Sequence, residues 1–342
     1  MAKIGIIGAG AFGTAVGNVV ASNGHTTILW SYEQEVADQI NQQHINQKYL
    51  PDIPLHQHLV ATTSLAQAVE DADAVIFIPP SQYTLELAQK ISPLLSPLDP
   101  PIIACMSKGF AIKDGKPWLL LDAIESQLPE WYYRQSVYIT GPTHAKELAS
   151  GVYSGMVAAS FTKQAAVHMQ KLLSNTHLKI TISDDVLGVQ MMAATKNIMA
   201  IIHGIVDGIA QTEKSIGDNT QSIIYAQGLT EIYELTAALC QTQIKTCLGP
   251  AGAGDLLVTA TSHHGRNRRF GYELVSLQLL ETYGTLENVL QKITYLPEGA
   301  YALRAIMSLE NRPQLPLMQT LWDILQKKKT PKEAIVSYLA GL

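Results

Sequence analysis

A glycine-rich turn near the start of the chain, directly after a short apolar run, constrains the fold more than any other feature. Residues 3–7 are typical of a buried parallel strand. Gly8, Gly10 and Gly13 follow in the spacing G-x-G-x-x-G, and residues 14–23 are helix-like. The first glycine allows a tight turn, the second lets the backbone approach a pyrophosphate, and the third lets helix and strand pack closely. The pattern predicts a dinucleotide site on the amides of the helix N-terminus. The alternative is a glycine-rich turn without a ligand.

The end of the second expected strand, residues 26–30, bears on the choice between NAD and NADP. An acid there binds a ribose 2′-hydroxyl, whereas an arginine accommodates a 2′-phosphate. The sequence has Ser31 and Tyr32 at this point, with neither an acid nor an arginine at the strand end. Glu33 follows and could serve as the acid from one step further on, but it points away if the strand alternation continues. Tyr32 can stack on adenine or donate one hydrogen bond. We therefore expect the chain to accept both NAD and NADP, with a preference of about tenfold to a hundredfold at most.

Strand-like and helix-like stretches alternate through the first half of the chain. Strands are expected at 74–78, 101–106, 137–140, 156–160 and 178–182, helices at 64–69 and 83–95, and a polar stretch at 35–59. Strand signals stop after Asp184. The pattern predicts an α/β fold with an N-terminal Rossmann-type doubly wound sheet, which forms a dinucleotide-binding domain over residues 1–183. A C-terminal all-helical substrate-binding domain over residues 184–342 follows it.

A long apolar run over residues 186–210 contains a single lysine, Lys196. The run is apolar on nearly every side, so it predicts a buried helix. Burying an ammonium ion is unfavourable unless it finds partners or gives up its proton, so Lys196 is a candidate for proton transfer. The alternative is a lysine whose head reaches water. His203 lies seven residues on, along the same helical face, and is interpreted as a core histidine.

The composition is that of an ordinary globular protein, with 342 residues, 47% hydrophobic and 15% charged. A formal net charge of −5 provides no basic field for nucleic acid or an anionic membrane, so neither partner is expected. Glycines and a polar asparagine interrupt the apolar N-terminus, which argues against a signal peptide. Cys105, Cys240 and Cys247 lack CxxC spacing, which suits a reducing cytoplasm. His263 and His264 fit no zinc-ligand spacing, so no metal is expected.

Eight stretches, in this order and spacing, resemble one family over essentially the whole chain. They are GAGAFGTA at 8–15, YLPDIP at 49–54, SKG at 107–109, GPTHAKELASG at 141–151, DDVLGVQ at 184–190, ATKN at 194–197, GAGDLLVTATS at 252–262 and RNRRFG at 266–271. The chain resembles the bacterial-type NAD(P)-dependent glycerol-3-phosphate dehydrogenases. The resemblance implies reversible reduction of dihydroxyacetone phosphate to sn-glycerol 3-phosphate with NADH or NADPH, in support of glycerophospholipid synthesis. It also implies a cytoplasmic homodimer.

The same resemblance implies a set of site residues. Lys196 matches the family's catalytic lysine, and hydride arrival at a ketone leaves an alkoxide that needs a positioned acid. The implied catalytic group is Lys196, Lys108 and Asp255. The implied cofactor-binding residues are Gly8, Gly10, Ala11, Phe12, Gly13, Tyr32, Lys108, Ala145, Arg266, Leu296 and Glu298. The implied substrate-binding residues are Lys108, Gly141, Thr143, Lys196, Asp255, Thr259, Gly265, Arg266 and Asn267.

Some residues keep a second interpretation. The run from Arg266 to Arg269 could be a solvated basic patch, and Asp255 could be an ordinary acid at a helix N-terminus. The chain departs from the family pattern at Phe12, Tyr32, Pro79, Gln221, Gln227 and Gly265. Two other functions compete with the leading one. The first is a related two-domain reductase of another phosphorylated or acidic hydroxy compound, and the second is a non-catalytic dinucleotide sensor.

Overall fold

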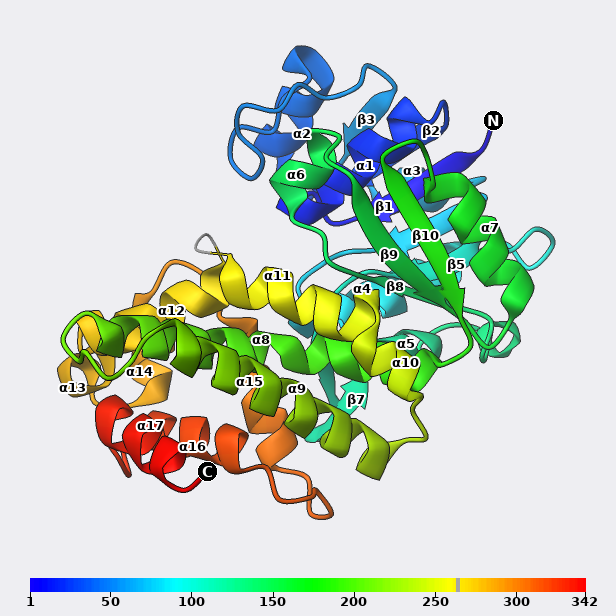
Figure 1. Ribbon diagram of the computed structural model, residues 1–342. Helices are drawn as coiled ribbons and strands as arrows, with labels where there is room; N and C mark the ends of the chain where they lie inside the picture. Colours follow the sequence, from blue (N-terminus) through cyan, green and yellow to red (C-terminus); the bar gives the residue numbers. More distant parts are fainter. Residues whose placement is uncertain (263–264) are drawn as a thin grey trace. The chain divides into compact units, whose positions relative to one another are not determined.

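The computed structural model describes residues 1–262 and 265–342, so His263 and His264 lie outside the described residues (Figure 1). The chain divides into two compact units, Met1–Gln190 and Met191–Leu342. The first unit is built on a sheet and the second is helical, so the predicted fold class is confirmed. The predicted boundary between residues 183 and 184 precedes this division and stays a prediction.

The first unit contains an eight-stranded sheet with the strand order β10-β9-β8-β5-β4-β1-β2-β3. Neighbouring strands are parallel except β8 and β9, which pair antiparallel. A separate hairpin pairs β6 with β7. The strands are β1 (Lys3–Ile7), β2 (Thr26–Trp30), β3 (Leu59–Thr62), β4 (Ala74–Phe77), β5 (Ile102–Cys105), β6 (Phe110–Lys113), β7 (Lys116–Leu119), β8 (Val137–Thr140), β9 (Ser154–Ala159) and β10 (Leu178–Ser183).

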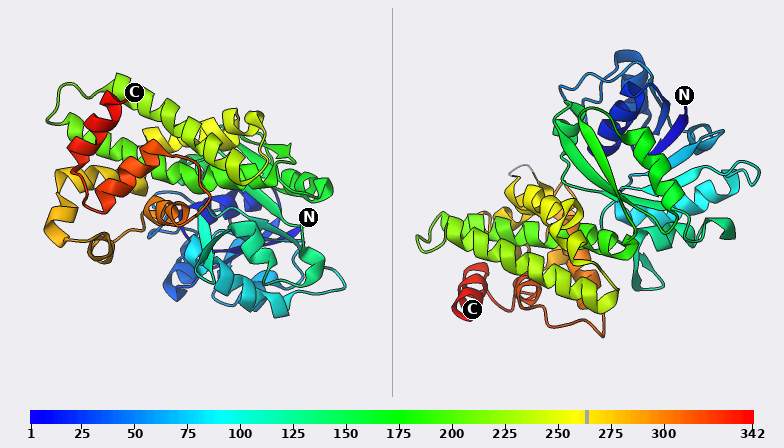
Figure 2. Two further views of the ribbon diagram at one scale, coloured as in Figure 1. Left: turned by 90° about the horizontal axis from the view of Figure 1, so that it is seen from below. Right: turned by 45° about the vertical axis from the view of Figure 1, so that its right-hand side comes forward.

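Helices cover both faces of this sheet (Figures 1 and 2). Ile4 and Ile6 of β1 belong to an apolar cluster that also contains residues of α1, α2, α6 and α7. Gly5 lies between them and points to the other face, where a Cβ would lie 2.0 Å from the carbonyl oxygen of Ala68 in α3. The helices are α1 (Ala11–Ser22), α2 (Gln34–Gln43), α3 (Leu65–Val69), α4 (Thr84–Ile91), α5 (Leu120–Glu125), α6 (Ala145–Ala149) and α7 (Lys163–Leu173), with short 3₁₀ turns η1 (Ser81–Tyr83), η2 (Ser92–Leu94) and η3 (Glu130–Tyr132).

Several elements differ from the sequence-based expectations. The stretch expected to be polar contains α2 and ends in β3, whose four residues are too few to show a clear alternation. The hairpin of β6 and β7 was not expected. The helix expected at 83–95 is divided, because Pro93 lies in η2 and the regular helix ends at Ile91. Helix α1 begins at Ala11 and not at Thr14, since the glycine turn already has helical geometry at its end.

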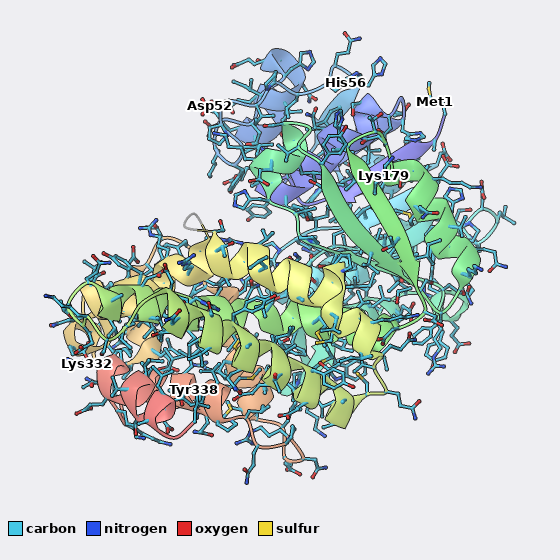
Figure 3. The ribbon with its side chains drawn as sticks, viewed as in Figure 1. Met1, Asp52, His56, Lys179, Lys332 and Tyr338 are labelled. Carbon is cyan, nitrogen blue, oxygen red and sulfur yellow. The ribbon has the colours of Figure 1, made fainter. Side chains whose placement is uncertain are left out.

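The second unit is formed around α8 (Val186–Ala210), which begins in the first unit. Helix α8 is long and apolar enough to cross a membrane, and the whole of its most apolar window is buried inside the structure. Close approaches to α8 occur at Gly228 of α9, Gly271 of α12 and Gly299 of α15. The other elements are α9 (Asp218–Leu239), α10 (Ile244–Leu248), the π-type turn η4 (Pro250–Gly254), α11 (Asp255–Thr261), α12 (Arg266–Ser276), α13 (Leu279–Tyr283), α14 (Leu286–Lys292), α15 (Glu298–Met307), α16 (Pro316–Leu325) and α17 (Pro331–Ala340), with Lys332 and Tyr338 marking α17 in Figure 3.

Candidate functional site

The glycine turn between β1 and α1 has the shape of a pyrophosphate site. Gly8 has a φ of +122°, a backbone conformation that residues with a side chain rarely adopt. A Cβ on Gly13 would lie 1.9 Å from the carbonyl oxygen of Gly8, so only glycine lets α1 begin this close to the strand. Gly10 caps α1 without a side-chain bond, and a Cβ there would meet no atom within 4 Å. Helix α1 therefore offers its first amides, Ala11 and Phe12 among them, to open space, where a dinucleotide pyrophosphate fits.

Lys108 follows the carboxyl end of β5, which lies at the same edge of the parallel strands as the glycine turn. The residue before it, Ser107, is held by two hydrogen bonds. The hydroxyl of Ser107 donates to the carbonyl of Pro79 at 2.5 Å, and the phenol of Tyr138 donates to the carbonyl of Ser107 at 2.8 Å. Gly109 comes next with a φ of +118°. The Pro79 carbonyl thus helps to fix the backbone directly before Lys108.

The residues predicted after β8 lie at this edge as well, since β8 is parallel to β5. Gly141 is held against β9, where a Cβ would lie 2.5 Å from the carbonyl oxygen of Gly155. The backbone N–H and the hydroxyl of Thr143 both donate to the Gly141 carbonyl, at 2.8 and 3.2 Å. Ala145 begins α6 and packs against the apolar cluster shared with α1. Close packing of the backbone therefore explains Gly141 and Ala145 independently of any ligand.

The end of β2 carries charge in a way that the sequence did not indicate. The backbone N–H of Gly8 donates to the Trp30 carbonyl at 3.1 Å, so this end adjoins the glycine turn. Tyr32 is 88% exposed, and the Ser31 hydroxyl bonds to the backbone of Glu33. The Glu33 carboxylate accepts from Lys48, a pairing that the sequence did not indicate, and this contact lowers the pKa of the carboxyl.

Lys196 is buried and paired in the helical unit, so the interpretation as a lysine reaching water is wrong. Lys196 is 6% exposed and its partner Asp255 is fully buried. The ammonium donates to the Asp255 carboxylate and, at 2.7 Å, to the Thr259 hydroxyl. Thr259 in turn donates to the Asp255 backbone carbonyl at 2.7 Å. The predicted neighbourhood of Asp255 and Thr259 on one face of α11 is confirmed as a three-residue cluster around Lys196.

The turn η4 aims Asp255 at Lys196. A Cβ on Gly252 would lie 2.0 Å from the Cys247 carbonyl oxygen, so the turn folds back tightly on α10. The phenol of Tyr225, on α9, donates to the Ala253 carbonyl at 2.8 Å. Asp255 begins α11 directly afterwards. Its carboxylate pairs with Lys196, so its role exceeds that of an ordinary acid at a helix N-terminus.

Helix α12 begins with the predicted phosphate-binding pair. Its cap is Gly265, and Arg266 is its first residue, with a side chain that is more than half exposed and lies 4.0 Å from Glu298. The carboxamide oxygen of Asn267 accepts from the Gly299 backbone N–H at 2.8 Å. Gly299 also approaches α8, where a Cβ would lie 2.3 Å from the Asn197 carbonyl oxygen. Gly299, at the start of α15, therefore contacts both α12 and α8. Leu296 and Glu298 lie just before it in the chain.

The remaining arginines of this run do not form a basic patch. Arg268 is buried and pairs with Asp207, and Arg269 pairs with Glu273 at 2.7 Å and lies over the Tyr295 ring. Arg268 is paired inside the helical unit, and the exposed Arg269 is paired with Glu273, so neither adds an uncompensated positive charge to a basic patch.

A polar network next to α12 was missed from the sequence. Asp207 accepts from Arg268 and also, at 2.8 Å, from the side-chain nitrogen of Gln221. The oxygen of Gln221 contacts Nδ1 of His203, which agrees with the prediction of a core histidine, and burial lowers the pKa of that imidazole. Asp207 is an acid within the apolar helix α8, so it could have been recognised from the sequence in the same way as Lys196. Gln227, the other departure on α9, is half-buried.

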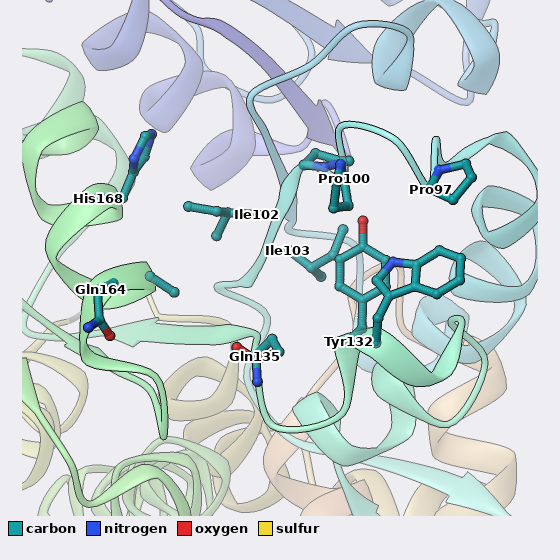
Figure 4. Close-up of a pocket in the computed structure, with 11 residues that line it drawn as sticks. Pro97, Pro100, Ile102, Ile103, Tyr132, Gln135, Gln164 and His168 are labelled. Carbon is teal, nitrogen blue, oxygen red and sulfur yellow. The ribbon is translucent and has the colours of Figure 1, made fainter.

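A cavity of about 610 Å³ lies in the first unit at the amino end of β5, at the edge of the parallel strands opposite the glycine turn (Figure 4). Pro100, Ile102, Ile103 and Tyr132 contribute to its lining, so it belongs to a different part of the unit from the cofactor site. Within residues 1–262 and 265–342, no cluster of three or more His, Cys, Asp or Glu side chains is arranged to hold a metal ion.

Comparison with known proteins identifies the family. Residues 3–166 match the N-terminal part of NAD-dependent glycerol-3-phosphate dehydrogenase, and residues 185–336 match its C-terminal part. The chain belongs to this family. A glycerol-3-phosphate dehydrogenase [NAD(P)+] of Treponema denticola is 37% identical over 99% of this chain and 98% of its own length. The enzyme of Lactiplantibacillus plantarum is 33% identical over 98% of this chain and 96% of its own length.

A solved glycerol-3-phosphate dehydrogenase supports the same assignment at the level of structure. The enzyme of Coxiella burnetii has a TM-score of 0.86 with this chain at 29% identity, and the match covers 99% of this chain and 98% of that one. As a member of the family, the chain is an NAD(P)-dependent oxidoreductase with a small-molecule substrate. The glycine turn and the open space beside Gly10 fit the NAD or NADP that such enzymes use.

Proposed function

We propose that this enzyme catalyses reversible hydride transfer between NADH or NADPH and dihydroxyacetone phosphate, giving sn-glycerol 3-phosphate. The observation that carries the proposal is the buried cluster of Lys196, Asp255 and Thr259 in the same unit as the α12 N-terminus. A bound nicotinamide supplies or removes the hydride. The residues of this chain hold the substrate and move a proton.

Lys196 is the proton donor in the direction of reduction. Hydride arrival at the ketone carbon of the substrate leaves negative charge on its oxygen, and an ammonium within reach can neutralise it. Asp255 and Thr259 accept hydrogen bonds from Lys196 and so restrict the direction of its side chain. A group held in this way loses little freedom when the substrate binds, which favours reaction.

Arg266 and Asn267 hold the phosphate of the substrate. A guanidinium fork matches a phosphate dianion, and Arg266 is exposed enough to receive one. The oxygen of Asn267 already accepts from Gly299, so its NH₂ group is the end that would donate to a phosphate oxygen. Gly265 and Thr259 also line the proposed substrate site. Glu298 lies 4.0 Å from Arg266.

Residues of the first unit bind the cofactor. The amides after Gly10 hold the pyrophosphate, Tyr32 contacts the adenosine, and Lys108 contacts both cofactor and substrate. Gly141, Thr143 and Ala145 shape the same edge of the sheet. The family resemblance adds Leu296 to the cofactor-binding residues.

The enzyme so proposed acts in the cytoplasm as a homodimer and supplies glycerol 3-phosphate for glycerophospholipid synthesis. Family membership supports this role, and so does the lack of CxxC spacing among Cys105, Cys240 and Cys247. The test is the dihydroxyacetone phosphate-dependent loss of NADH absorbance with the purified enzyme, repeated with NADPH. Turnover with dihydroxyacetone phosphate and none with unphosphorylated dihydroxyacetone is expected. A lack of activity with both NADH and NADPH would exclude the proposal.

A further inference from the structure

An ion pair at the end of β2 places opposite charges next to the glycine turn. The Nζ atom of Lys48 lies 2.5 Å from one carboxylate oxygen of Glu33, and the Tyr49 phenol donates to the other at 2.9 Å. Glu33 caps α2, directly after the strand end that bonds to Gly8. In doubly wound folds the residues at this strand end face the 2′ position of the adenosine ribose. The pair therefore lies where NAD and NADP differ.

Asn46 attaches the segment that carries Lys48 to the glycine turn. Asn46 is fully buried, and its Nδ2 atom donates to the Ala9 carbonyl at 3.0 Å and to the Thr14 hydroxyl at 2.8 Å. Its Oδ1 atom accepts from the Tyr49 backbone N–H at 3.2 Å. The position of Lys48 is thus set by buried bonds to the same turn that receives the pyrophosphate, and the rest of this loop, with Asp52 and His56, continues beyond it (Figure 3).

The pair is exposed enough to exchange partners. The side chains of Lys48 and Glu33 are 53% and 33% exposed, and ion pairs of this kind contribute little to stability. A phosphate dianion attracts an ammonium more strongly than a single carboxylate does, and the lysine stem is flexible. Glu33 keeps the Tyr49 hydrogen bond when Lys48 leaves, and its oxygens have lone pairs left for a ribose hydroxyl.

We propose that Lys48 binds the 2′-phosphate of NADPH, while Glu33 accepts a hydrogen bond from the 2′-hydroxyl of NADH. With NADH, Lys48 stays on Glu33. With NADPH, Lys48 turns to the phosphate and screens it from the Glu33 carboxylate. The exchange explains how one site accepts both cofactors without an arginine at the strand end, and it rests on the proposed function as an NAD(P)-dependent enzyme.

Direct binding measurements test this without turnover. Dissociation constants of NADPH, NADH, 2′,5′-ADP and 5′-AMP are measured by titration calorimetry for the wild type and for Lys48→Met. We expect Lys48→Met to weaken NADPH and 2′,5′-ADP about 10- to 100-fold and to leave NADH and 5′-AMP within about threefold. Glu33→Gln should have the opposite effect. It should lower the ratio of the NADPH to the NADH dissociation constant about tenfold, so that the variant prefers NADPH more than the wild type does.

Lys90→Met is the matched control, because Lys90 and Glu86 form an equally short and more exposed pair on α4 of the same unit. It should change none of the four constants. Equal weakening of all four nucleotides by Lys48→Met, or no weakening of any, would overturn the role of Lys48. If the wild-type enzyme bound neither NADH nor NADPH, the proposed function itself would fail, so the two failures are distinguishable.

Discussion

Arg268 and Asp207 form a two-point ion pair inside the helical unit, with 2.6 Å between Nε and Oδ2 and 3.0 Å between Nη2 and Oδ1. The pair joins α12 to α8. Gly204 and Gly271 let these helices approach, since a Cβ on Gly204 would lie 1.9 Å from the Arg268 carbonyl oxygen. Because Arg266 and Asn267 are on the same helix turn as Arg268, the ion pair positions them relative to Lys196 on α8.

Asp207→Asn should destabilise the protein and weaken substrate binding. Arg268 would keep a buried charge without its partner, and breaking a buried ion pair costs roughly 3 kcal/mol. We expect a lower unfolding midpoint in urea and a higher KM for dihydroxyacetone phosphate. Glu287→Gln, which breaks the exposed pair with Arg304, is the control and should change stability by less than about 0.5 kcal/mol. Equal stability of the two variants would show that the Asp207 pair is not needed for packing.

Lys196→Met should lower kcat by about 10²-fold or more, because the variant keeps the length of the side chain and removes its proton. Binding of NADH, measured by titration calorimetry, should stay within about threefold of the wild-type value. Lys292→Met, on the exposed face of α14, controls for the loss of a lysine. Near-normal turnover of Lys196→Met would remove Lys196 from the chemistry.

Arg266→Ala should lower kcat/KM for dihydroxyacetone phosphate about 10- to 100-fold, the range expected for a charge-assisted hydrogen bond. Unphosphorylated dihydroxyacetone should be an equally poor substrate for the variant and the wild type, since it carries no group for the guanidinium to bind. Arg269→Ala is a close control, because that neighbouring guanidinium already pairs with Glu273. A variant that lost affinity for the cofactor alone would contradict the phosphate assignment.

Glu231 should make stability depend on pH. Its buried carboxyl accepts from the backbone N–H groups of Leu317 and Met318 at the start of α16, and burial raises its pKa to about 7. An unfolded glutamate releases its proton near its ordinary pKa of 4.5. Between these values the folded chain binds more protons, so the contribution of Glu231 to stability is largest below pH 4.5 and declines as pH rises towards 7.

The difference in unfolding free energy between Glu231→Gln and the wild type, measured by urea denaturation from pH 4.5 to 8, isolates this effect. The change across the window should be roughly 3 kcal/mol at most. Glu333→Gln should give a nearly flat difference over this window. Hydrogen bonds from Thr330 lower the pKa of Glu333, so its contribution to stability is lost mainly as pH falls below the ordinary value of 4.5. A flat difference for Glu231→Gln would mean that the folded chain releases this proton near the ordinary pKa.

Short-range chemistry allowed several features to be predicted from the sequence. The glycine spacing of Gly8, Gly10 and Gly13 depends on local backbone conformation, and buried parallel strands such as β1 are continuous apolar runs. Lys196 was recognisable because a charge in an apolar helix needs a partner. The family resemblance then located Asp255, Thr259 and the α12 pair, which neither periodicity nor composition identifies.

Only the tertiary structure decided which groups pair across the chain. The partner of Lys196 lies 59 positions away, and that of Arg268 lies 61 positions away. The partner of Glu33, Lys48, lies in a loop whose place depends on the buried Asn46. Strand alternation predicted that Glu33 would point away, because that rule describes the backbone and contains no information about a cation brought from another segment. The sequence determines which residues must be buried and where the chain must form a turn. Long-range packing determines which charged side chains form ion pairs.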